Sequence, residues 1–140
     1  MQTIRFFLEK EESDVLMTLI KAFFFRKEFF AMNIYTKEGI TIVITEHRLD
    51  ALVSVKFKDT VKKLVEDGSQ KILIDMGETV FIDSAGCGAL VASLRALSKN
   101  KGDMKIARPS SQVQTLFELT RLHKVFEIFE DVESASKSFS

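Results

Sequence analysis

The chain has 140 residues, which is enough for one domain whose hydrophobic core needs no disulfide or metal for support. Its 20 Lys and Arg residues balance its 20 Asp and Glu residues, and no contiguous basic block occurs, so the charge pattern argues against binding to nucleic acid or anionic lipid. The single cysteine, Cys87, excludes an internal disulfide, and no secretory signal is visible. We therefore expect a protein of the reducing cytoplasm in which Cys87 is a small core residue.

Residues 1–31 differ from the rest of the chain because they are rich in Phe, and we treat them as an N-terminal extension to a domain at 32–140. Apolar spacing after Ser13 predicts an amphipathic helix, which is too short and too charged to span a bilayer. Three interpretations stay open: a helix at a membrane surface, a partner-binding helix, or a stretch that is not translated. We favour the last, with Met32 as the natural start, because the codons for Arg26–Glu28 can form a purine-rich sequence like a bacterial ribosome-binding site.

Strands and helices alternate in the remaining sequence. The expected strands cover residues 34–37, 40–45, 71–76, 104–107 and 125–129. The expected helices run from Asp50 to Glu66, from Ser84 to the turn at 100–102, from the capping box of Ser111 and Gln114 to Thr120, and from Asp131 to Phe139. This order predicts an α/β fold with a mixed sheet of four to five strands, in which a hairpin is followed by β/α units whose helices pack against the sheet.

Ser84 is the residue with the clearest functional potential, because it stands where an apolar strand and turn give way to a helix of small residues, Phe81–Gly88. The first N–H groups of a helix have no internal partners and carry the positive end of its dipole, so they stabilise an oxygen or a phosphate. Ser84 can be an N-cap, which contributes about 1 kcal/mol, or a phosphoacceptor beside Asp83, and both roles can hold at once.

Catalytic and metal-binding alternatives have little support in the sequence. A Gly-x-Ser-x-Gly motif is absent, and no motif links His47 or His123 to Ser84. One cysteine and two distant histidines do not form a metal-ligand pattern, and the glycines around Cys87 lack the rest of a nucleotide-binding loop. We expect no enzymatic activity, no cofactor and no metal.

Several motifs in order identify a resemblance. They are Leu49-Asp50-Ala51 at the start of a long helix, Ile72–Met76 as a central strand, Phe81–Gly86 as a hydrophobic pair followed by Asp-Ser-Ala-Gly, and Leu116–Phe126 as a late helix with a closing Leu-x-x-x-Phe. Together they resemble a stand-alone STAS domain of the bacterial anti-sigma factor antagonist type, over residues 33–140. The sequence departs from that pattern at Cys87, where Leu is usual, and at His47-Arg48, where Gly-x is usual.

This resemblance implies a protein-binding switch. In similar proteins the unphosphorylated domain docks on an anti-sigma factor that is also a serine kinase, and a sigma factor is released. The kinase then phosphorylates the serine that follows the signature Asp, here Ser84, and a serine phosphatase restores the active form. An alternative is a cytoplasmic STAS subunit of a membrane complex for lipid or anion transport.

The partner-binding surface is expected around Ser84 and its neighbours in the predicted topology. The residues assigned to it are Asp83, Ser84, Ala85, Gly86, Gly88, Asp50, His47, Glu78 and Thr79.

Overall fold

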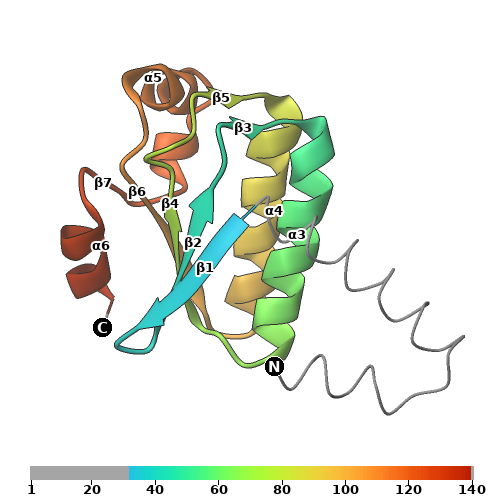
Figure 1. Cartoon of the computed structure of the whole chain (residues 1–140), viewed down its shortest axis with the longest axis vertical. Coiled ribbons are helices and arrows are strands. Elements are labelled where there is room, and N and C mark those ends of the chain that lie inside the picture. Colours follow the sequence, from blue (N-terminus) through green and yellow to red (C-terminus); the bar gives the residue numbers. More distant parts are fainter. Residues whose placement is uncertain (1–31, 140) are drawn as a thin grey trace, which may run out of the picture. The chain divides into compact units, whose positions relative to one another are not determined.

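The structure is a computed structural model and describes residues 32–139 (Figure 1). The hypotheses about residues 1–31, an amphipathic helix and a natural start at Met32, therefore fall outside the described residues. Within the described range, strands and helices alternate after an initial hairpin, as predicted.

A five-stranded mixed sheet forms the centre of the domain. Its strands, in spatial order, are β1 (Met32–Lys37), β2 (Ile40–Thr45), β4 (Lys71–Asp75), β6 (Asp103–Ala107) and β7 (Ile128–Phe129). β1 and β2 are antiparallel, and the other neighbouring pairs of this sheet are parallel. Parallel neighbours need a crossover connection, and helices supply it between β2 and β4 and between β4 and β6. The predicted α/β fold with its mixed sheet is confirmed.

Helices cover both faces of this sheet. Within residues 32–139 they are α3 (Ala51–Glu66), α4 (Ser84–Lys99), α5 (Ser111–Leu119) and α6 (Val132–Ser138), with a 3₁₀ turn η1 (Leu122–Lys124) after α5. α3 and α4 lie side by side on one face, and α6 lies on the other (Figure 1). Side chains alternate along β4, so Ile72 and Ile74 join the large core under α3 and α4, whereas Leu73 joins a smaller core under α6. Burial on both faces explains the continuous apolar run of this strand.

A second, two-stranded parallel sheet was not predicted from the sequence. It consists of β3 (Arg48–Leu49) and β5 (Phe81–Ile82), with Arg48 paired with Phe81 and Leu49 with Ile82. α3 begins just after β3 and α4 just after β5, so this small sheet brings the N-termini of both helices to the same edge of the domain (Figure 1).

Two predicted boundaries are wrong. The last strand was predicted over 125–129, but only Ile128–Phe129 forms β7. The N–H groups of Val125 and Phe126 both donate to the Leu122 carbonyl at 2.9 Å, so the chain is still coiled there, and this turn buries Phe126.

The N-cap of α5 is Ser110 and not Ser111, since the Ser110 hydroxyl accepts from the Val113 N–H at 3.2 Å. The predicted cap of α6 is confirmed, because the Asp131 carboxylate accepts from the Ser134 N–H at 2.6 Å.

A buried lysine connects α6 to the sheet. Lys105 of β6 is 5% exposed and points to the α6 side. Its Nζ donates to the carbonyl oxygen of Ser138 at 3.0 Å and to the hydroxyl of the same residue at 2.9 Å, and it lies 4.7 Å from the ring centroid of Phe139. Hydrogen bonds compensate for the lost hydration of the ammonium group, and they hold the end of α6 against the sheet.

Candidate partner-binding site

Ser84 is the first helical residue of α4, and its exposed hydroxyl has no hydrogen-bond partner among the described residues. The N-cap is Asp83, whose extended backbone lets a carboxylate oxygen accept from the Gly86 N–H at 2.9 Å. The interpretation of Ser84 as the cap itself is therefore wrong. Because Asp83 stabilises the start of the helix, the Ser84 hydroxyl is left free at the surface.

Gly86 is buried where α4 passes close to the backbone of β3. A Cβ atom at this position would overlap the carbonyl oxygen of Leu49 and would lie 2.8 Å from Cγ1 of Ile82. The absence of a side chain therefore lets the first turn of α4 pack on the small sheet. Gly86 shapes the site from within and does not belong to an exposed docking surface, which corrects its predicted role.

His47 joins the two loops that lead into the small sheet. Its carbonyl oxygen accepts from the N–H groups of Val80 at 2.8 Å and Phe81 at 3.1 Å, and its ring Nδ1 donates to the Glu78 carbonyl at 2.9 Å. His47 and Arg48 do not have positive φ, so the glycine that is usual here is not required by this backbone. His47 and Glu78 are both exposed, and their role in partner binding stays a prediction.

Asp50 is the N-cap of α3, as predicted, and is half-buried. Its carboxylate accepts from the N–H groups of Leu52 at 3.1 Å and Val53 at 3.2 Å, and it pairs with Arg48 at 3.4 Å. The hydrogen bond from the Val53 N–H is the main cause that holds the pKa of Asp50 below its usual value. Asp50 therefore remains a carboxylate at neutral pH at the edge where Ser84 lies.

Thr79 is 1% exposed, so its predicted place on the docking surface is wrong. Its hydroxyl donates to the Glu46 carbonyl at 2.7 Å and lies 2.5 Å from the hydroxyl of Thr45. A buried hydroxyl needs such partners, and here they fix the loop that follows β4 to the end of β2. Thr79 positions its exposed neighbours instead of contacting a partner.

The structure brings most of the predicted residues to one surface, which we call the Ser84 edge and define as residues 46–52 and 76–88. It is formed at the C-terminal ends of β2 and β4 by the small sheet and the first turns of α3 and α4 (Figure 1). Ala85 and Gly88 are exposed on α4 next to Ser84, and a Cβ atom on Gly88 would meet open space. Sequence reasoning missed seven further exposed residues of this edge: Glu46, Arg48, Ala51, Leu52, Gly77, Val80 and Phe81.

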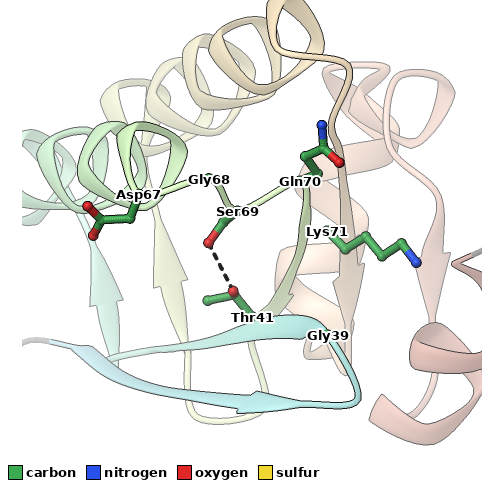
Figure 2. Close-up of a pocket in the computed structure, with 7 residues that line it drawn as sticks. All are labelled: Gly39, Thr41, Asp67, Gly68, Ser69, Gln70 and Lys71. Carbon is green, nitrogen blue, oxygen red and sulfur yellow. Dashed lines mark hydrogen bonds between the residues drawn. The ribbon is translucent and has the colours of Figure 1, made fainter.

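The two hollows found in residues 32–139 lie away from Ser84. The first, of about 320 Å³, is at the N-terminal ends of β2 and β4. There the hydroxyl oxygens of Thr41 and Ser69 face each other at 3.2 Å (Figure 2). The second, of about 510 Å³, lies between Gln114 and the segment 123–129. Neither hollow includes a residue of the Ser84 edge.

Comparison with known families assigns this architecture. The family model for the STAS domain matches residues 31–135. The chain belongs to the STAS domain family. The match covers both sheets and all the helices that form the Ser84 edge.

Several proteins similar to this STAS domain are bacterial. An anti-sigma-B factor antagonist from Staphylococcus aureus is 27% identical over 85 residues, which is 61% of this chain and 79% of that protein. A Thermotoga maritima protein, provisionally assigned as an anti-sigma factor antagonist, has a TM-score of 0.73 at 21% identity over 79% of this chain and 94% of its own. The phosphorylated form of the Bacillus cell fate determinant SpoIIAA has a TM-score of 0.61 at 16% identity over 76% of this chain and 98% of its own. At these identities the structural matches establish the fold of the STAS domain.

Two further properties of the described part of the STAS domain bear on its chemistry. No helix within residues 32–139 combines the length and apolar character needed to cross a membrane. In the same range, His, Cys, Asp and Glu side chains do not gather in groups of three or more that could hold a metal ion.

Cys87 is buried, and burial raises the pKa of its thiol, with a smaller contribution from the negative charge of Asp83.

Proposed function

We propose that this STAS domain is an anti-sigma factor antagonist that docks through the Ser84 edge on an anti-sigma factor and loses affinity when Ser84 is phosphorylated. The observation that carries the proposal is the free, exposed Ser84 hydroxyl on the first turn of a helix that Asp83 already caps. The family membership and the name of the Staphylococcus aureus relative support the same role. The phosphorylated form of SpoIIAA supports a phosphate on a domain of this fold.

The geometry suits a reversible modification. Phosphorylation adds about −1.5 to −2 charges at pH 7. At Ser84 these charges would lie at the N-terminus of α4, where the helix dipole favours an anion, so the fold need not change. The carboxylate of Asp83 stands beside this position, and a partner in contact with Ser84 would meet both charges. Phosphate therefore acts on docking and not on folding.

The proposed partners follow from this switch. An anti-sigma factor with serine kinase activity binds the unphosphorylated domain and modifies Ser84, and a serine phosphatase reverses the modification. The STAS domain itself is the regulated binding protein and carries out no catalysis. Binding of the anti-sigma factor frees the sigma factor that it would otherwise hold.

A phosphorylation experiment tests the modified residue. We expect the anti-sigma kinase encoded in the same genome, with ATP, to label the wild-type chain and not Ser84→Ala, as measured by intact mass and peptide mapping. Ser111→Ala is the matched control and should be labelled like the wild type. Ser111 is also the exposed first residue of a helix, and Ser110 is the N-cap of that helix. Normal labelling of Ser84→Ala would show that the phosphoacceptor lies elsewhere.

A binding experiment tests the effect of the charge. We expect Ser84→Asp to weaken the complex with the anti-sigma factor by about a hundredfold, which corresponds to about 3 kcal/mol. Ser111→Asp adds the same charge at an equivalent helix position outside the Ser84 edge and should leave affinity unchanged. Isothermal titration calorimetry measures both, and equal affinities for the two variants would contradict the proposal.

The alternative, a subunit of a membrane transport complex, predicts a different partner. Isolation of the native complex through this chain and mass spectrometry of its components separate the two functions. Recovery of an ATP-binding anti-sigma kinase supports the proposal, whereas recovery of a transport ATPase or an anion transporter supports the alternative.

A further inference from the structure

Three large apolar side chains are exposed among the residues of the Ser84 edge. Leu52 is 82% exposed in the first turn of α3, and Val80 and Phe81 are 56% and 39% exposed at the start of β5. We call these three residues the apolar patch. Exposed apolar groups that cluster beside a functional residue are typical of protein interaction surfaces, whereas scattered ones need no explanation.

The backbone gives these side chains no place in the core. Along β5, Ile82 points inward and is buried, so its neighbour Phe81 must point outward. In α3, Phe57 and Val61 supply the buried face, and Leu52 lies outside it. A polar residue at any of the three exposed positions would be compatible with the fold, so folding alone does not require the apolar patch.

The loop that carries part of the apolar patch is held in place before any partner binds. The carbonyl oxygen of His47 accepts from the N–H groups of Val80 and Phe81, and the buried Thr79 is bonded to the end of β2 through Thr45 and Glu46. The guanidinium carbon of Arg48 lies 4.2 Å from the ring centroid of Phe81, which fixes one side of that ring. A surface that is ordered in advance loses less entropy on binding.

We propose that Leu52, Val80 and Phe81 form the centre of the docking surface, and that the facing surface of the anti-sigma factor carries apolar side chains ringed by Lys or Arg. This inference rests on the proposed function and adds the residues that supply the binding energy. The charge that we expect on the partner follows from the charged side chains of the Ser84 edge. Glu46 and Glu78 are exposed, while Arg48 is already paired with Asp50. Carboxylates therefore dominate around the apolar patch, and a basic rim on the partner complements them.

The same arrangement explains why phosphate would weaken the complex although the partner is basic. Ser84, Ala85 and Gly88 present only small side chains, so the partner surface can approach the backbone of α4 closely. A phosphate there would project from a surface without other large groups and would lose water inside the interface. Buried charge without a matched partner opposes binding, whereas charge at the rim mainly changes the association rate.

Substitution of the apolar patch tests the proposal with the intact chain and the anti-sigma factor of the same genome. We expect Leu52→Gln and Val80→Gln each to weaken the complex by about tenfold, because each places an amide that loses its water where the partner offers apolar groups. Val125→Gln is the matched control, since Val125 is 50% exposed and lies in the segment 123–129 that lines the second hollow, away from the Ser84 edge. All three positions are exposed, and circular dichroism should show the same fold for each variant.

The outcomes separate this inference from the proposed function. If Leu52→Gln and Val80→Gln bind tightly while Ser84→Asp binds weakly, the proposed role of the apolar patch is wrong and the proposed function is still supported. No complex with the wild-type chain overturns both. The basic rim has its own readout, because association should slow as salt rises, and Glu78→Gln should associate more slowly at low salt than the wild type. An association rate that rises with salt would exclude a basic partner surface.

Discussion

Gly86 and Gly88 are two residues apart in α4, yet their surroundings differ completely. Gly86 faces the backbone of β3, where a side chain would overlap the Leu49 carbonyl, whereas Gly88 faces open space. Neither glycine has a positive φ, so the difference is one of room and not of backbone conformation. Substitution of each by the same residue therefore separates the packing role of a glycine from its entropic cost in a helix.

We expect Gly86→Ala to destabilise the domain by about 1–3 kcal/mol, because the first turn of α4 must move away from β3 to admit the methyl group. Gly88→Ala should stabilise it by about 0.5–1 kcal/mol, since alanine favours the helix. Urea unfolding followed by circular dichroism measures both changes. Equal changes in the two variants would show that Gly86 has no packing role.

At the residue scale the sequence located the helix start correctly but not its cap. Asp83 and Ser84 are both good N-cap residues, and only the backbone of the folded chain shows that Asp83 takes this role. The burial of Thr79 and Gly86 likewise could not be predicted from the sequence, because the residues that cover them lie more than thirty positions away in the chain. Ala85 and Gly88, which extend the helix from Ser84, were placed on the surface correctly.

At the scale of elements, the loop after β4 depends on an ion pair that spans two strands. Asp75 is 3% exposed at the end of β4, and its two carboxylate oxygens accept from Nε and a terminal nitrogen of Arg108 at 2.8 and 3.0 Å. The first of these oxygens also accepts from the Gly77 N–H at 3.0 Å. The hydrogen bonds that Arg108 donates to Asp75 raise the pKa of Arg108 further. This pair joins the start of the Ser84 edge to the end of β6.

We expect Arg108→Gln to destabilise the domain by about 2 kcal/mol, because the buried Asp75 carboxylate loses its cation. Arg121→Gln is the control: Arg121 shares the left-handed backbone, with φ of 61° against 58° for Arg108, but it is exposed and forms no ion pair within residues 32–139. Hydrogen exchange should also quicken at residues 77–80 in Arg108→Gln alone. Unchanged exchange in this loop would mean that the pair does not hold it.

Long elements were predictable and short ones were not. The hairpin, α3 and α4 have enough residues for their apolar periods to stand out, and each was placed within a residue or two. β3, β5 and β7 have two residues each, which is too few for any period. The Ser84 edge was therefore predicted as a set of residues near one serine, and the small sheet that assembles it was found only in the structure.

At the scale of the whole domain, the two faces of the sheet are covered unequally. The face toward α3 and α4 carries a large core, whereas the other face carries a small cluster that includes Ile42, Leu73 and Ala135. α6 has seven residues, so its own helical hydrogen bonds add little stability. Its attachment relies on this cluster and on Lys105, and we expect the α6 face to open more readily than the α4 face.

We expect Lys105→Met to lower the free energy of unfolding by about 1.5–3 kcal/mol, since hydrogen bonds to a charged group are lost. Lys137→Met removes an exposed lysine that pairs with Glu133 at 2.9 Å, and it should leave the free energy of unfolding nearly unchanged because water screens an exposed ion pair. Limited proteolysis should release the C-terminal segment faster from Lys105→Met than from Lys137→Met. Equal rates would indicate that the apolar cluster alone retains α6.

The strand order also decides how this protein can be handled in experiments. Met32 pairs with Thr45 at the C-terminal end of β2, so β1 begins at the end of the sheet where Ser84 lies. α6 lies toward the opposite ends of the strands, near the hairpin turn that joins β1 and β2 (Figure 1), where Phe139 packs against the cluster that includes Ile40. A fluorescent protein or affinity tag that replaces residues 1–31 would therefore be tethered beside the proposed docking surface and would obstruct a partner, whereas the same tag after the C-terminus would leave that surface clear.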